Sequence, residues 1–193
     1  MAEPKRQGWK RSVTREIVKT GKIKGVFKDE IWKKDGNGVP YLDQVTDPTE
    51  NLIVTAASQL LAGLMLNEST FTGGILQHAQ GEGFVAWDTL LPDPTLGQTQ
   101  LNVELARIAP DSIVYLDGAS LPTLTITNTI QIKTTYDFLT PSALNGKFIR
   151  EQGLFGGDAT GTINSGFMID AINHVKIFKD SSIRIVRFID LTF

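Results

Sequence analysis

The sequence predicts a mainly β protein, an antiparallel β-sandwich or small barrel with one buried helix and an extended basic N-terminal arm. Residues 183–193 alternate between inward apolar and outward side chains, and residues 127–138 place a polar residue at nearly every odd position. A period of two sets one face of a strand against a core and leaves the other in water. Seven or eight such segments, separated by short turn signals, are typical of sandwiches and small barrels.

The arm, residues 1–46, is predicted from the distribution of charge. Residues 1–34 contain eleven Lys or Arg against four Asp or Glu, a net charge of +7, and the rest contains eight against seventeen, a net charge of −9. Residues 1–20 have too few apolar side chains to form a core of their own. A basic arm and an acidic body favour contact with a neighbouring copy over contact with nucleic acid or a membrane surface. A solvated arm is the remaining alternative.

Four apolar residues of the arm are expected to anchor it on another subunit: Trp9, Ile17, Phe27 and Trp32. Residues 22–45 are predicted to form a hairpin or extended segment around the turn signal at 35–38, where Gly and Asn accept a positive φ. Trp32 precedes two lysines and can stack on a base, but such a group is more often a surface patch. We therefore expect copies of the same chain, rather than nucleic acid, as partners.

The body, residues 47–193, is predicted to begin with a helix over about 48–66. Asp47 can cap this helix, Pro48 suits its first turn, and Glu50 completes a capping box. Apolar residues then recur at helical spacing, and residues 55–66 carry no charge. We expect the helix to be covered on both faces and to pack against the sheet.

The remaining elements follow from apolar runs and from the Gly, Pro and Asn residues between them. The final strand is expected to be paired into the sheet, because apolar ends that are not paired fray. In chain order we predict strands within 69–87, a loop over 88–99, one or two helical turns over 99–107, strands over 111–116 and 121–138, a strand over 147–155, a flexible loop over 156–166, a strand over 168–177 and the final strand.

Motifs for catalysis, metal binding and cofactor binding are absent from the sequence. The chain has no cysteine, which excludes disulfides, thiolate zinc sites and a cysteine nucleophile. It contains no nucleophile elbow, zinc-protease motif or phosphate-binding loop. His78 and His174 lack the spacing of metal ligands, and His78 is interpreted as a half-buried or surface residue. We expect no cofactor, no metal and no enzymatic activity.

One alternative is a site for binding or hydrolysing carbohydrate. Asp88 and Glu104 flank a loop and could form the carboxylate pair of a sugar hydrolase, with Trp87 in contact with the sugar. Loop carboxylates are more often solvated. The first ten residues lack the apolar core of a secretory signal, and no run of 18 apolar residues occurs, so we expect no membrane span.

Five segments within residues 50–193 carry a resemblance to a known family. They are NLIV at 51–54, AWD at 86–88 with QTQL at 98–101 and ELAR at 104–107, the strands 111–117 and 130–138, IREQGLFGGDA at 149–159, and SGFMI at 165–169 followed by the terminal strand. The most specific of these is REQGLFGG. In this order the segments resemble a family of small virion proteins of tailed bacteriophages.

The resemblance implies a non-enzymatic structural protein of the tail, baseplate, neck or fibre attachment, made in the host cytoplasm and located in the virion. Its implied partners are copies of itself, as a homo-oligomer, and other virion proteins. The arm would order on a neighbour by β-augmentation or anchored side chains. Arg150 and Glu151 are expected at a strand edge, fixing a turn at 153–157. Alternatives are a capsid decoration protein, a carbohydrate-binding tail module, or a nucleic-acid binder through the arm.

Overall fold

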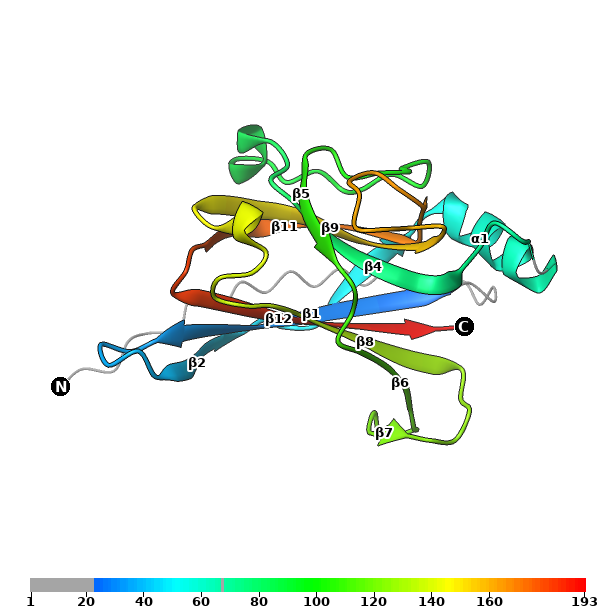
Figure 1. Ribbon diagram of the computed structural model, residues 1–193, viewed down its shortest axis with the longest axis horizontal. Coiled ribbons are helices and arrows are strands. Elements are labelled where there is room, and N and C mark those ends of the chain that lie inside the picture. Colours follow the sequence, from blue (N-terminus) through cyan, green and yellow to red (C-terminus); the bar gives the residue numbers. More distant parts are fainter. Residues whose placement is uncertain (1–22, 67) are drawn as a thin grey trace.

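The computed structural model describes residues 23–66 and 68–193 as two facing layers of strands (Figure 1). The lower layer in the figure contains β1 (Lys24–Lys34), β2 (Pro40–Val45), β12 (Ile183–Thr192), β8 (Thr129–Tyr136), β6 (Ser112–Leu116) and β7 (Pro122–Thr123). The upper layer contains β5 (Glu104–Ile108), β4 (Gly73–Gly81), β9 (Lys147–Gly157), β10 (Phe167–Met168) and β11 (Asp170–Lys179). Short 3₁₀ turns, η1 (Val85–Asp88) and η2 (Ser142–Leu144), lie in the connections.

A single strand, β3 (Thr49–Ile53), joins the two layers because it pairs with β1 on one side and with β11 on the other. The strand order is β5-β4-β9-β11-β3-β1-β12-β8-β6-β7, and every pair is antiparallel. This confirms the predicted class, a mainly β antiparallel fold with one helix. The two ends of the order, β5 and β7, do not pair with each other, so the described strands form an open sandwich rather than a closed barrel.

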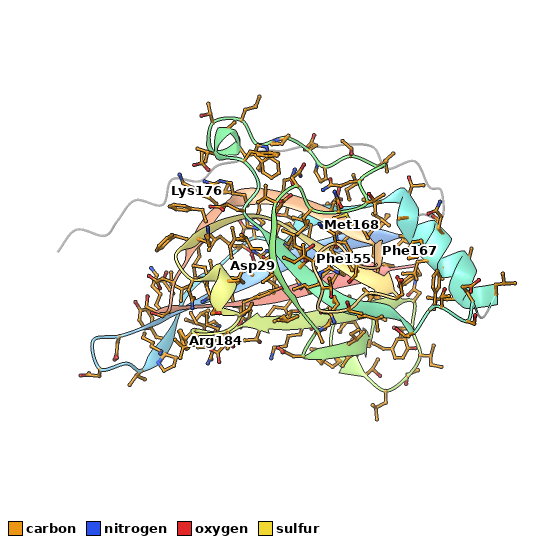
Figure 2. All side chains as sticks on the ribbon, turned by 45° about the horizontal axis from the view of Figure 1, so that its top comes forward. Asp29, Phe155, Phe167, Met168, Lys176 and Arg184 are labelled. Carbon is orange, nitrogen blue, oxygen red and sulfur yellow. The ribbon has the colours of Figure 1, made fainter. Side chains whose placement is uncertain are left out.

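The alternation predicted for the last strand is confirmed. Ile185, Ile189 and Leu191 on β12 are buried between the layers, and β12 itself is hydrogen-bonded to β1 and β8. The main apolar cluster contains residues from both layers, including Phe27, Ile132, Leu154, Ile172 and Ile189. A second cluster, which includes Phe155 and Met168, lies toward α1 (Figure 2).

The prediction of an arm over residues 1–46 is wrong for residues 24–34, whereas the predicted hairpin is present, since β1 and β2 pair antiparallel on either side of the turn at 35–38. Strand β1 lies inside the body, between β3 and β12, and ten of its residues face residues of β12. Its inward side chains are Phe27, Asp29 and Ile31, and all three are buried. The alternation of β1 was obscured in the sequence because a carboxylate occupies the middle of the inward face. Residues 1–22 of the predicted arm lie outside the described residues.

The helix is shorter than predicted: α1 spans Thr55–Leu66, and residues 49–53 form strand β3 instead of its first turns. The capping signal at Asp47 is overridden because β3 gains hydrogen bonds from β1 and β11 at once. Ala57 and Leu60 pack into the core, whereas Leu61 and Leu66 are exposed. No helix among residues 23–66 and 68–193 is long and apolar enough to cross a membrane.

The helical turns predicted over 99–107 are also wrong, since this segment ends in strand β5, which pairs with β4. The strands predicted over 111–116, 121–138, 147–155 and 168–177 correspond to β6, β8, β9 and β11. On β8 the even residues Ile132, Thr134 and Tyr136 face the interior and are fully buried, as the alternation indicates.

Candidate functional site at the open end of the sandwich

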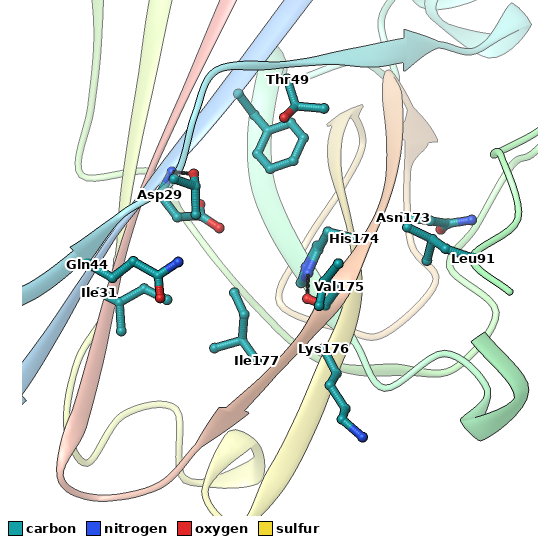
Figure 3. Close-up of a pocket in the computed structure, with 12 residues that line it drawn as sticks. Asp29, Ile31, Gln44, Thr49, Leu91, Asn173, His174, Val175, Lys176 and Ile177 are labelled. Carbon is teal, nitrogen blue, oxygen red and sulfur yellow. Dashed lines mark hydrogen bonds between the residues drawn. The ribbon is translucent and has the colours of Figure 1, made fainter. Parts of the chain in front are cut away.

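A pocket of about 420 Å³ opens between β1 and β11, where the two layers part (Figure 3). It forms because β3 covers β1 only up to Phe27, and β2 takes over from Glu30 onward. The connecting residues 46–48 leave the sheet there, and β11 loses its pairing with β9 between Asn173 and Ile177. The volume lies within the range of small-molecule sites, about 300–1,000 Å³.

The inner wall of the pocket carries one buried carboxylate, Asp29, which is 1% exposed. Its backbone N–H donates to Thr46 Oγ1 at 2.8 Å, and its Oδ2 lies 3.1 Å from Arg187 Nη1. The other oxygen, Oδ1, has no hydrogen-bond partner among the described residues. Burial raises the pKa of Asp29, and the charge of Arg187 opposes this rise. The pocket therefore offers one unpaired acceptor.

His174 faces Asp29 from the opposite strand, β11, and orients Arg187 (Figure 3). Its Nε2 is 3.0 Å from Arg187 Nη2, and its Nδ1 is 2.8 Å from the carbonyl oxygen of Val175. Because a guanidinium only donates and a carbonyl only accepts, Nδ1 carries the proton and Nε2 accepts. Burial and the charge of Arg187 lower the pKa of His174 to about 3. At neutral pH this histidine is an uncharged support for Arg187, not a proton carrier.

A separate buried polar group surrounds the other histidine. His78 on β4 is fully buried, with Nδ1 3.0 Å from Thr134 Oγ1 and Nε2 2.9 Å from Gln152 Oε1. The hydroxyl of Tyr136 donates to the His78 carbonyl at 2.7 Å. Burial, followed by the charge of Arg187, lowers the pKa of His78 to about 3. The prediction of a half-buried or surface histidine is wrong for His78, which joins the two layers.

The residues considered for sugar hydrolysis do not form an acid pair. Asp88 receives two hydrogen bonds from Arg150, at 2.8 and 3.1 Å, and one from Lys176 at 2.7 Å, which hold its pKa well below the usual range. The side chain of Glu104 is fully buried and bound to Arg107, with Oε2 2.7 Å from Nη2. Each carboxylate is thus neutralised by its own arginine, and Glu104 cannot touch a ligand. Trp87 packs edge-on against the ring of Phe84.

The most specific segment of the resemblance lies at the centre of the upper layer. Strand β9 runs between β4 and β11 and extends through Gly157, so Arg150 and Glu151 are not at a sheet edge and no turn occurs at 153–157. Glu151 accepts hydrogen bonds from the backbone N–H groups of Val103 at 2.7 Å and Asn102 at 3.0 Å. In the sequence, the run Arg150-Glu151-Gln152 places three polar residues in an otherwise apolar strand, which indicates that they bind neighbouring segments. In the fold each is buried and binds a different one: Asp88, residues 102–103 and His78.

The most exposed strand is β2, the outer strand of a hairpin that projects beyond the body (Figure 1). All six of its residues are exposed, and it pairs on one side only, with β1. Val39, Tyr41, Leu42 and Val45 present apolar surface there. We call the segment 34–46 with these four side chains the hairpin surface. An unpaired strand edge with apolar residues is a template for pairing with another chain.

Of the four anchors predicted for the arm, Trp9 and Ile17 lie outside the described residues. Phe27 is corrected: it faces the interior of β1 opposite Ile189 and belongs to the core, so it cannot anchor another subunit. Trp32 is half-buried at the base of the hairpin, and its indole N–H donates to Glu30 Oε2 at 3.3 Å. The sequence had no local signal for the pocket, because its walls come from distant segments.

Within the described part of the chain, no group of three or more His, Asp or Glu residues is placed to hold a metal ion. The sequence matches no protein-family model and no curated protein sequence.

Proposed function

We propose that the protein is a non-enzymatic structural component of a tailed-phage particle, which assembles as a homo-oligomer through its N-terminal residues and the hairpin surface. The observation that carries the proposal is the hairpin: a one-sided strand, exposed at every residue and apolar at its outer end. Pro40 and Asp43 on β2 oppose uncontrolled pairing, but the strand is paired on one side only among the described residues, and its apolar side chains stay exposed. The resemblance of residues 50–193 to tailed-phage virion proteins supports a place in a phage particle, and the exposed hairpin supports contact between subunits.

The N-terminal 46 residues, which the sequence predicts to be a single arm, have two different roles. Residues 24–34 belong to the body, and two segments are left for contact between subunits: residues 1–22 and the hairpin surface. The first carries seven Lys or Arg against two Asp or Glu, a net charge of +5, and the rest carries twelve against nineteen, a net charge of −7. Opposite charges on the two parts favour association between copies and make it sensitive to salt.

The assembly is tested by sedimentation equilibrium of the full chain and of a hairpin variant, Leu42→Lys with Val45→Lys. We expect an oligomer for the parent chain and weaker association for the variant, because lysine on an edge strand opposes pairing. Val85→Lys is the matched control, since Val85 is more exposed than either residue and lies on η1, outside the hairpin. A parent chain that stays monomeric at high concentration contradicts the proposal.

The location is tested by labelling tailed particles with an antibody to the chain and imaging them. Label at the tail, baseplate, neck or fibre attachment supports the proposal. Label over the head surface supports the alternative, a capsid decoration protein, and particles without label contradict both.

A carbohydrate-binding module is a second candidate, favoured by the pocket. Asp29 and Arg187 balance each other and His174 is neutral, so the pocket suits an uncharged ligand. The amides of Gln44 and Asn173 line the rim, and apolar side chains such as Phe27 line the walls. A glycan array with the parent chain and Gln44→Ala tests this candidate; no bound glycan on either chain excludes it.

A further inference from the structure

A second hollow, the groove between α1 and the ends of β8 and β12, differs from the pocket because it has no charged lining. Its volume is about 210 Å³, and every residue that lines it is apolar or glycine. Side chains from five elements meet there, among them Leu61 and Leu64 of α1, Ile113 of β6 and Ile130 of β8. Leu61 and Ile113 are each 42% exposed, and Phe193 at the mouth is also exposed.

The chain itself indicates the occupant. Ile23, the first described residue, is part of the groove lining, so the described part of the chain starts at this groove. Within residues 1–22, the aliphatic side chains larger than alanine and proline, apart from the initial Met, are Val13, Ile17 and Val18. They lie within six residues of one another, and Lys or Arg residues surround them. A short apolar group on a basic segment matches an apolar groove on an acidic body.

We infer that the groove binds residues 13–18 of a second copy of the chain, with Ile17 beside Leu61. The inference rests on the proposed function and names the place where the N-terminal residues attach. Within one chain, Ile17 lies six residues before Ile23, a span of at most about 20 Å. To enter the groove of its own body, the segment must reverse direction within the four residues 19–22. A second copy has no such constraint, and mutual exchange of the two segments closes a symmetric dimer.

The groove and the hairpin surface lie at opposite ends of the body, as Figure 1 shows for α1 and β2. The two contacts therefore do not compete for the same surface. Exchange of residues 13–18 can build one interface while the hairpin surface builds another, which is the arrangement that a ring or a stacked particle component requires.

The absence of cysteine makes the test direct, because any introduced thiol is the only one in its chain. Ile17→Cys and Leu61→Cys are made as separate full-length chains, mixed, and treated with a mild oxidant. We expect a disulfide-linked species of twice the chain mass on a non-reducing gel. Ile17→Cys mixed with Val39→Cys is the matched control: Val39 is 58% exposed but lies at the hairpin end, and we expect little crosslinking.

The outcomes separate this inference from the proposed function. An oligomer in the centrifuge without the Ile17–Leu61 crosslink overturns the inference and leaves the proposed function standing. A crosslink that forms only within one chain, in a variant carrying both substitutions, also overturns it. A monomeric chain overturns both. An additional variant, Leu61→Glu, is expected to weaken association about tenfold or more, whereas Leu66→Glu on the same helix, outside the groove, is expected to leave it unchanged.

Discussion

Asp29 and Arg187 face each other directly across β1 and β12, and their charged groups meet between the layers. Nη1 of Arg187 lies 3.1 Å from Oδ2 of Asp29, with side chains that are 0% and 2% exposed. The contact has the distance of an ion pair without the geometry of a hydrogen bond, since Nη1 and Nε of Arg187 lack hydrogen-bond partners among the described residues. Two opposite charges in a dry interior depend on each other, because each is costly alone.

Arg187→Met is therefore expected to lower the free energy of unfolding by about 3–5 kcal/mol, the usual cost of leaving one buried charge unpaired. The double variant Asp29→Leu with Arg187→Met is expected to be more stable than either single variant. Urea unfolding measures all three. The control is Arg184→Met on the same strand, whose pair with Asp137 is partly exposed and should contribute about 1 kcal/mol or less. Additive losses in the double variant would contradict the pairing.

The two buried histidines predict loss of stability in acid. Both have a folded pKa of about 3, against 6.5 when exposed, so below pH 6.5 the unfolded chain binds more protons and stability falls. Asp170 and Asp29 act in the opposite direction: burial raises the pKa of both, that of Asp170 to about 6, so they stabilise the fold as pH drops. From pH 7 to 5 the histidines cost about 2 kcal/mol each and Asp170 returns about 1, which gives a loss of about 2–3 kcal/mol that Asp29 reduces.

This pH dependence is measured by urea unfolding at pH 7, 6 and 5. The chain has only these two histidines, so replacing one with glutamine should remove about half of the histidine effect. Stability that stays level or rises on acidification would show that the histidines are not held neutral in the folded state.

Arg150 is expected to hold the connection between β4 and β5 against the upper layer. Its guanidinium binds Asp88 on η1 and also donates to the carbonyl of Glu82 at 3.1 Å. Asp88→Asn removes the charge and should increase hydrogen exchange across residues 82–98, with little change in the exchange of β9. Asp93→Asn in the same connection is the control, because Asp93 forms no ion pair with any described residue. Equal exchange in both variants would mean that packing alone fixes the loop.

Gly156 is predicted to be irreplaceable by any larger residue, because β9 and β4 approach too closely there. A Cβ at this position would lie 1.5 Å from the carbonyl oxygen of Gly74, which is backbone and cannot rotate away. Gly156→Ala should cost about 3 kcal/mol or more, or prevent folding. Gly161→Ala, with nothing within 4 Å of its added methyl group, should change the free energy of unfolding by about 0.5 kcal/mol or less. Thermal unfolding of both variants measures the contrast.

The sequence predicted the fold class well because alternation reports burial directly. Residues 127–138 and 183–193 lie next to each other in the lower layer. Each has one buried face that is apolar except for a single polar residue, Thr134 in the first and Arg187 in the second. It predicted a hairpin over residues 22–45 but not that β1 belongs to the body, because Asp29 interrupts the inward face of β1 and the arginine that neutralises it is far away in the chain. No local pattern shows that a charge will be paired after folding.

The site was harder to predict than the fold for the same reason. Its pocket exists because residues 46–48 leave the sheet and β11 is interrupted at Asn173, and both events depend on strand pairing. Likewise, residues 47–50 have a helix-capping sequence, but the helix does not start there because residues 49–53 form β3, which pairs with two strands. The sequence shows Arg150, Glu151 and Gln152 as three polar residues in an apolar strand, but it does not predict their hydrogen-bond partners, which come from distant segments.

The register of β1 with β12 also constrains how the molecule reaches this shape. Lys24 is opposite Thr192, so the longest run of facing strand residues joins segments near the two extremes of the described chain. Closing so large a loop costs entropy before any contact rewards it, and proteins dominated by such pairings fold in milliseconds to seconds. Until that step, β1 and β12 each lack one neighbour and can pair with other chains, so crowding during synthesis favours aggregation.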